Sequence, residues 1–290
     1  MILTLLQGRL GNQLFQVFVT IAAAIETNQS FAFYSKPKDN ECVYWDTVFR
    51  PLRQNVIYTK IKHHMLYEQH VTQCFDYFPF FNKLTGCKGK MCLLVGWFQH
   101  LNYLKLHFDT IVDMLQLRQL QDQIFKIRAP QMPYITDWGT TVSMHFRLGD
   151  FLSNQHKNKF PVMPPQYYLD ALQAVCSQTD QSLLQVIYFC ELTDLPLVLP
   201  VITELEHRFP RCQFYKVIDG LKDWEEMLLM SCCQHHIIAN STFSFWGAYL
   251  GKQYGVQPKQ VCYPSLWLTD DLPRHLNDSF PDTWTRIEVL

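Results

Sequence analysis

The residues best suited to chemistry lie in segment 144–150, which reads Met-His-Phe-Arg-Leu-Gly-Asp. The apolar run 142–146 predicts a buried strand. Because side chains alternate along a strand, His145 and Arg147 should share one face. Both stand at the strand's carboxyl end, where open parallel sheets bind their ligands. An arginine there could hold a diphosphate bidentately, and the histidine could donate a further hydrogen bond. A strand with one solvated face would show the same pattern.

A second polar run, Asn-Ser-Thr-Phe at 240–243, follows a predicted strand and precedes a short apolar helix predicted over 245–250. Hydroxyl groups and unpaired backbone N–H groups at the start of a helix form a natural anion site. Ordinary helix capping is the alternative explanation for Ser241 and Thr242. Together with Arg147, this run predicts a site for a phosphate-bearing ligand.

Two glycines three residues apart, Gly8 and Gly11, lie between an apolar run and a helix predicted over 12–26. In such a strand-to-helix turn, glycines let the backbone approach a phosphate-bearing ligand. Asn12 could face that ligand. It could equally cap the helix, with Gln16 as the other half of a capping box, and both roles can hold at once.

Two carboxylates, Asp150 and Glu191, stand at the carboxyl ends of predicted strands. Either could act as a general base towards an attacking hydroxyl group, although Gly-Asp pairs such as 149–150 are also common in turns. No Asp-x-Asp motif, which would hold a metal against a nucleotide diphosphate, occurs in the sequence. We therefore predict no metal site, and expect Arg147, His145 and helix N-termini to stabilise the charge on a leaving diphosphate.

In chain order, these segments resemble glycosyltransferase family 11, the bacterial and animal α-1,2-fucosyltransferases. The family's N-terminal motif reads roughly Gly-Gly-Leu-Gly-Asn-Gln-Met-Phe-Gln, which is close to residues 8–16. Further similar pieces are Gly96-Trp97-Phe98-Gln99, the stretch 227–250 and Pro264-x-x-Trp267. In one departure, the family usually carries His-x-Arg-Arg-Gly-Asp, and Leu148 replaces the second arginine here.

The resemblance implies an inverting, metal-independent enzyme that transfers L-fucose from GDP-L-fucose, its donor substrate, to a glycan acceptor, as an α-1,2 linkage to a galactoside. A transferase for another nucleotide sugar is one alternative. An inactive relative that binds a nucleotide or a partner is another, suggested by Leu148 and by the altered acidic pair at 191–194. No cofactor is expected. The expected catalytic residues are Arg147, His145, Asn12 and Asp150, and the expected donor-binding residues are Gly8, Gly11, Gln13, Glu191, Asn240, Ser241, Thr242 and Phe243.

Strands and helices alternate along both halves of the chain, which predicts parallel sheets covered by helices. The proline-rich stretch 129–139 is the best candidate linker, so the predicted domains are 1–139 and 140–290. We expect two Rossmann-like domains facing each other across a cleft, the first on the acceptor side and the second binding GDP-fucose. This α/β, GT-B-like architecture is also what the resemblance implies.

Composition narrows the class of protein. With 290 residues, 48% of them hydrophobic and 18% charged, the chain can bury the core of a globular enzyme. A net charge of −1 argues against nucleic-acid binding, which needs an excess of lysine and arginine. The N-terminal apolar run lacks a basic flank and breaks at Gly8, so we expect no membrane span and a cytoplasmic location. The ten cysteines, which form no zinc-like Cys-x-x-Cys pair, are expected to be reduced thiols.

Overall fold

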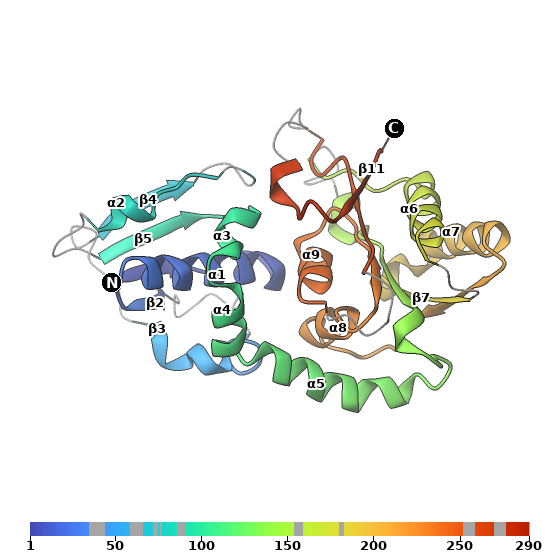
Figure 1. The fold of residues 1–290 in the computed structure, drawn as a ribbon, viewed down its shortest axis with the longest axis horizontal. Coiled ribbons are helices and arrows are strands. Elements are labelled where there is room, and N and C mark those ends of the chain that lie inside the picture. Colours follow the sequence, from blue (N-terminus) through green and yellow to red (C-terminus); the bar gives the residue numbers. More distant parts are fainter. Residues whose placement is uncertain are drawn as a thin grey trace. The chain divides into compact units, whose positions relative to one another are not determined.

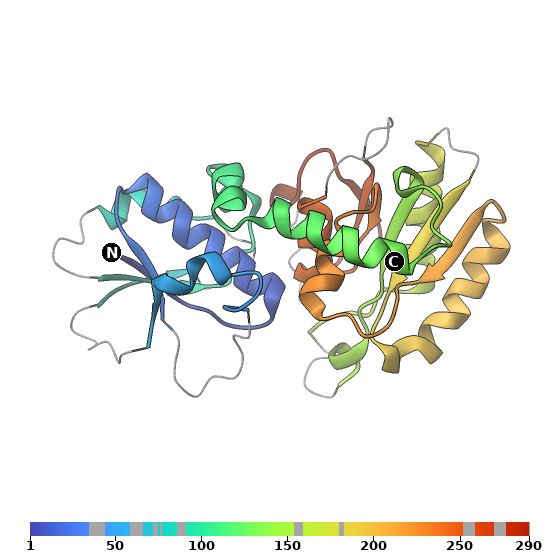
Figure 2. The same cartoon turned by 90° about the horizontal axis from the view of Figure 1, so that it is seen from below.

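The computed structural model describes residues 1–34, 44–58, 66–71, 75, 77–85, 91–153, 159–179, 183–251, 259–269 and 277–289. The chain forms two compact units. Unit 1 is Met1–Leu120 with Asp278–Phe280, and unit 2 is Gln121–Asn277 with Pro281–Leu290. Every strand pairing that the structure describes is parallel, and each unit is built on one sheet (Figures 1 and 2). This confirms the predicted GT-B-like fold class of two Rossmann-like α/β units.

Unit 1 is built on a five-stranded sheet of order β3-β2-β1-β5-β4. The first strand lies in the middle, where Ile2 is beside both Phe31 and Cys92. Its residues come from the apolar run that predicted a buried strand, and Ile2 and Leu3 are fully buried. The strands are β1 (Ile2–Leu5), β2 (Phe31–Tyr34), β3 (Val56–Ile57), β4 (Leu66–Val71) and β5 (Met91–Gly96).

Helix α1 begins at Leu10, two residues before the predicted start. The residue at its N-cap is Arg9 rather than Asn12. Gln16 instead joins the loop after β1 to the end of β5, because its Oε1 accepts from the Gln7 N–H at 2.9 Å and its Nε2 donates to the Gly96 carbonyl at 3.2 Å. The capping box of Asn12 and Gln16 was therefore wrong. The helices that begin in unit 1 are α1 (Leu10–Glu26), α2 (Phe81–Leu84), α3 (Leu101–Lys105), α4 (Phe108–Met114) and α5 (Leu117–Arg128), with a 3₁₀ turn at Arg50–Asn55.

Unit 2 is built on a six-stranded sheet of order β11-β10-β9-β6-β7-β8. Its first strand, β6, lies in the interior. The next strands extend to one side of β6 and the later ones to the other, so the chain changes direction between β6 and β9. In open parallel sheets this topological switch point is where ligands bind. The strands are β6 (Thr141–His145), β7 (Leu184–Phe189), β8 (Cys212–Lys216), β9 (His235–Ile237), β10 (Val261–Pro264) and β11 (Thr285–Ile287).

The helices of unit 2 cover both faces of this sheet. Figure 1 shows α6 and α7 on one side and α8 and α9 on the other, as right-handed crossovers require when the strand order reverses. Leu172 and Leu205 are fully buried in a core cluster with Val142 and Met144 of β6. Burying each leucine contributes about 1.5–3 kcal/mol. The helices are α6 (Pro165–Ser177), α7 (Leu195–Arg208), α8 (Asp223–Met230) and α9 (Thr242–Tyr249), with 3₁₀ turns at Ala129–Gln131, Trp138–Thr140, Gly149–Leu152 and Leu192–Asp194. A further 3₁₀ turn, Asn277–Ser279, lies where the chain passes from unit 2 to unit 1.

The two units divide within α5, earlier than the predicted boundary after Gly139. Polar contacts explain the difference. The buried Gln121 amide donates to Ser231 Oγ at 2.6 Å and to the Leu250 carbonyl at 3.0 Å. At the end of α5, Arg128 pairs with Glu225 at 2.5 Å. These contacts assign most of α5, and the proline-rich stretch after it, to unit 2.

None of the helices in the described parts of the chain is both long enough and apolar enough to cross a membrane. The cysteines that the structure describes are free thiols: Cys92, Cys176, Cys190, Cys212, Cys232, Cys233 and Cys262.

Candidate active site

The residues predicted for the site in unit 2 gather at the switch point. His145 is the last residue of β6, and Asn240 and Ser241 follow β9. The two strands are neighbours, with Ser143 beside His236, so their carboxyl ends meet at one edge of the sheet. This is the edge at which a Rossmann-like sheet binds its ligand.

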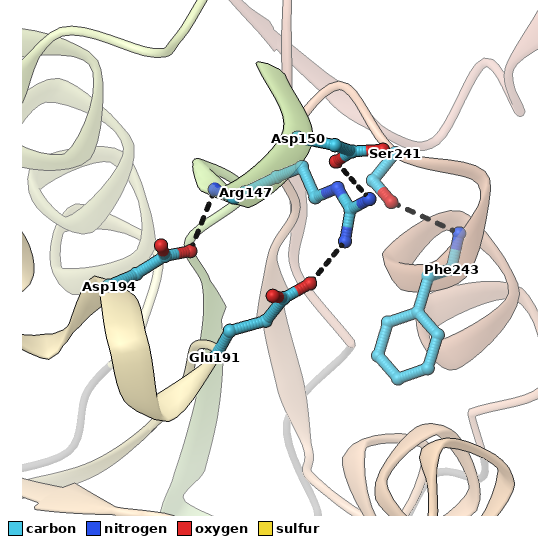
Figure 3. Close-up of polar contacts among 7 residues, drawn as sticks. Arg147, Asp150, Glu191, Asp194, Ser241 and Phe243 are labelled. Atoms are coloured by element: carbon cyan, nitrogen blue, oxygen red, sulfur yellow. Dashed lines mark hydrogen bonds and ion pairs between the residues drawn. The ribbon is translucent and has the colours of Figure 1, made fainter. Parts of the chain in front are cut away.

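Arg147 lies two residues beyond β6, at the centre of a cluster of charges (Figure 3). Its Nη1 donates to Glu191 Oε1 at 3.1 Å, and its Nη2 donates to Asp150 Oδ1 at 2.5 Å. The guanidinium also lies over the Phe151 ring, 5.3 Å from the ring centroid. Its side chain is only 17% exposed. The structure therefore brings three predicted residues together, with both carboxylates as counter-ions of one arginine.

The turn that carries Arg147 is held by a residue that we did not predict. Asp194 is buried, and its Oδ2 accepts from the Gly149 N–H at 2.9 Å (Figure 3). Gly149 has a φ of +26°, and a Cβ added there would lie 3.2 Å from Glu191 Oε2. The backbone conformation thus favours glycine at this position. The available sequence signal was a carboxylate three residues after Glu191, just before α7.

His145 is buried beside the Phe243 ring, 5.4 Å away between ring centroids. Burial, together with the positive charge of Arg147, lowers the pKa of His145 to about 3. The imidazole is therefore neutral at physiological pH, and it can offer a ligand one N–H but no charge. Its Nδ1 has no hydrogen-bond partner among the described residues. Because buried polar atoms are nearly always paired, this atom indicates a place for a ligand group.

The run after β9 combines structural contacts with one unsatisfied atom. Asn240 Nδ2 donates to the Pro161 carbonyl at 2.8 Å and to the Trp267 carbonyl at 3.1 Å. Its buried Oδ1 has no hydrogen-bond partner in the part of the chain that the structure describes. Ser241 caps α9, since its Oγ accepts from the Phe243 N–H at 3.3 Å. Capping by Ser241 is thus observed, and anion binding by Ser241 and Thr242 stays a prediction.

The predicted residues of unit 1 gather around a single turn. Gly8 has a φ of +73°, which favours glycine. The fully buried Gln13 donates its Nε2 hydrogen to the Gly8 carbonyl at 2.8 Å, so this side chain supports the turn. Gly11 lies inside the first turn of α1 rather than in the loop. Asn12 lies over Gly8, because a Cβ added to Gly8 would stand 2.6 Å from Asn12 Nδ2.

Glu226 of α8 is a further carboxyl group that sequence reasoning missed. Burial raises its pKa to about 7, opposed by the charge of Lys216 and reinforced by the negative charges of Asp223, Glu191 and Asp219. Since Glu191 also pairs with Arg147, its effect on the pKa of Glu226 couples this carboxyl group electrostatically to the Arg147 cluster. The sequence signal was an acidic residue directly before the apolar run 227–230 of α8.

The raised pKa of Glu226 predicts a stability that depends on pH. Between its ordinary value of 4.5 and about 7, the folded protein binds a proton that the unfolded chain has lost. Stability therefore falls as pH rises through this window, by about 1–2 kcal/mol after allowance for solvent screening. Glu226→Gln should remove this part of the dependence, which melting curves of both proteins between pH 4.5 and 7.5 would show. Equal slopes for the two proteins would contradict the assignment.

Comparison with known proteins extends the family resemblance to nearly the whole chain. Residues 6–287 match glycosyl transferase family 11. The alpha-1,2-colitosyltransferase of Escherichia coli is 26% identical over 303 residues, covering 98% of this chain and 97% of that protein. The O-antigen biosynthesis glycosyltransferase WbnK of Escherichia coli is 26% identical over 223 residues, covering 73% of this chain and 68% of that protein. Among solved structures, a mutant FUT1 of Arabidopsis thaliana in complex with GDP aligns at 12% identity with a TM-score of 0.46, covering 87% of this chain and 68% of that one. On the extent of the family match, the chain belongs to glycosyl transferase family 11.

Proposed function

We propose that this family 11 glycosyltransferase moves L-fucose from GDP-L-fucose to a sugar hydroxyl, forming an α-1,2 linkage to a galactoside with inversion at the anomeric carbon. The sequence motifs support this proposal, as does the similarity to an α-1,2-colitosyltransferase. Colitose is L-fucose without its 3-hydroxyl group, so the two sugars present nearly the same shape to a donor site.

The observation that carries the proposal is the position of Arg147 at the switch point of unit 2. In the reaction, the bond between the sugar C1 and the diphosphate oxygen breaks, and negative charge develops on the departing GDP. Arg147 is the cation placed to stabilise it, and the neutral His145 can donate a hydrogen bond beside it. Asp150 and Glu191 hold the guanidinium in place beforehand. A diphosphate that binds Arg147 shares it with these carboxylates or displaces them.

The acceptor hydroxyl attacks C1 from the face opposite the departing diphosphate, and its proton passes to a base. Asp150, in the 3₁₀ turn that follows β6, and Glu191, two residues after β7, remain the candidates for that base. Because both carboxylates also pair with Arg147, substitutions are needed to separate the two roles. A substitution that weakens only donor affinity would indicate that the carboxylate is a counter-ion of Arg147. A change that lowers kcat at saturating donor would indicate the base.

Transfer of colitose is a second candidate, favoured by the name of the similar Escherichia coli enzyme. Purified protein should be assayed with GDP-L-fucose, GDP-colitose, GDP-mannose and UDP-galactose against a panel of terminal galactosides, with NMR of the product to assign the linkage. We expect the highest kcat/KM for GDP-L-fucose. A site that hydrogen-bonds the 3-hydroxyl group of fucose rejects colitose strongly. Faster turnover of GDP-colitose than of GDP-L-fucose would instead favour colitose transfer as the function. GDP binding without turnover of any donor would favour an inactive relative.

We expect transfer to need no divalent metal. The sequence lacks an Asp-x-Asp motif, and the proposed mechanism assigns the leaving-group charge to Arg147. Initial rates in excess EDTA should stay within about twofold of the untreated rate, because no metal-supplied stabilisation is removed. A large loss of rate that Mg²⁺ or Mn²⁺ restores would contradict this expectation.

A further inference from the structure

Unit 1 has a switch point of its own, between β1 and β5. From β1 the chain continues to β2 and β3 on one side, whereas β5 and β4 lie on the other. The loops that follow β1 and β5 therefore meet at the carboxyl edge of the sheet, where a ligand can enter. Gly8 and Asn12 belong to the first loop and the helix after it. Gln99 belongs to the second loop, which carries the Gly-Trp-Phe-Gln motif at 96–99.

A hydrogen bond joins helix α1 to the second loop at this point. Gln99 Nε2 donates to Asn12 Oδ1 at 2.8 Å, and Gln99 is buried. The bond fixes the orientation of the Asn12 side-chain amide. The oxygen is directed to Gln99, and Nδ2 lies on the side of Gly8.

The backbone around Gln99 is strained. Phe98 has a φ of +55°, a left-handed conformation that costs a non-glycine residue about 1–3 kcal/mol. Its fully buried ring is held by Phe80 and Tyr103, at centroid distances of 6.0 and 5.8 Å. Gly96 is also confined, since a Cβ there would lie 2.6 Å from the Val71 carbonyl oxygen. The core of unit 1 thus enforces the loop conformation that delivers Gln99 to Asn12.

We propose that Gln99 is a positioning residue for Asn12. It holds the asparagine amide with Nδ2, a hydrogen-bond donor, beside the Gly8 turn, where Nδ2 donates to an oxygen of the substrate bound at the carboxyl edge of this sheet. This inference rests on the proposed function, and it extends that function to a residue that does not itself touch the substrate. A glutamate at this position could only accept, so Asn12 would turn its nitrogen towards it and present oxygen to the substrate.

The test compares substitutions that differ in what they do to the Asn12 amide. In Gln99→Glu, kcat should fall by about 10–100-fold, because a misplaced contact weakens stabilisation of the transition state. Gln99→Leu removes the hydrogen bond to the Asn12 amide without favouring the reversed orientation, so kcat should fall by less than about tenfold. Gln29→Glu is the matched control. It adds the same charge elsewhere in unit 1, where Gln29 contacts Met1 and Leu84, and it should leave kcat unchanged.

A double-mutant cycle separates positioning from a merely structural role. In an Asn12→Ala background, Gln99→Glu should change kcat by less than about twofold, because its target is gone. The same loss in both backgrounds, or a Gln99→Glu enzyme as active as wild type, would overturn the proposal. Melting midpoints of all variants should lie within about 5 °C of wild type, as for other modest losses of stability.

A second readout does not depend on activity. In protein labelled with ¹⁵N-asparagine, the side-chain NH₂ signals of Asn12 are those missing from Asn12→Ala. They should shift in Gln99→Glu and stay in place in Gln29→Glu. If the wild-type protein turned over no nucleotide sugar, the proposed function would fail, whereas an unmoved Asn12 signal would by itself overturn the role of Gln99.

Discussion

Arg147→Ala should lower kcat by about 10²–10³-fold, the loss typical when a preorganised group of about 3–4 kcal/mol is removed from a transition state. The reason is the position of the guanidinium, which is held at the switch point by Asp150 and Glu191. Arg147→Lys should recover only part of the rate, since an ammonium keeps the charge but loses the planar fork. Steady-state kinetics with the preferred nucleotide sugar would measure both effects.

Arg128→Ala is the matched control for this experiment. It also breaks an ion pair within unit 2, with Glu225, but it lies at the end of α5 and has no part in the proposed chemistry. Its kcat should match wild type. The two carboxylates left behind in Arg147→Ala are more than a third exposed, so its stability should change by less than about 1 kcal/mol. A folded Arg147→Ala enzyme within tenfold of the wild-type kcat would mean that the diphosphate binds elsewhere.

Leu148→Arg should destabilise the protein, although most relatives were expected to carry an arginine at this position. The partly buried Leu148 side chain packs against the apolar core cluster of unit 2. A longer, charged side chain must either overpack this contact or pull away from it. We expect a loss of about 2–3 kcal/mol, which for a unit of this size lowers the melting midpoint by roughly 5–10 °C.

Leu148→Met serves as the control for Leu148→Arg, because it keeps the volume and the apolar character. It should change stability by less than about 1.5 kcal/mol. If Leu148→Arg had the same melting midpoint as the wild-type protein and a higher kcat, the side chain would have to face the substrate rather than the core.

The strands and helices that sequence predicted best are those with long apolar runs. Strand β6 was predicted over 142–146 and lies one residue earlier, at Thr141–His145. Strand β4 was missed because Glu68 and His70 interrupt its pattern. Strands β10 and β11 have only four and three residues, too few to show a period. The early start of α1 was missed because Arg9 is not a usual capping residue.

Prediction of the candidate site was limited in a different way. The positions of the motifs after predicted strands were enough to predict that His145, Arg147 and Asn240 lie at the carboxyl edge of a sheet. The residues that pair with this segment are brought to it by tertiary contacts, which a local sequence pattern cannot show. Glu191 lies 44 residues from Arg147 in the sequence, and Asp194 lies 45 residues from Gly149. The neutral state of His145 and the raised pKa of Glu226 follow from burial, which sequence shows only indirectly. The cleft between the two units stays a prediction.

Under the proposed function, the charges around Arg147 also imply that GDP binding is coupled to proton uptake. One guanidinium faces two carboxylates, and Glu226, with a pKa of about 7, feels the charge of Glu191. A diphosphate adds negative charge to this group and favours the protonated form of Glu226 further. Near neutral pH, the protein should therefore take protons from solution as GDP binds, and GDP affinity should fall as pH rises. Calorimetry in buffers of different ionisation enthalpy would count those protons.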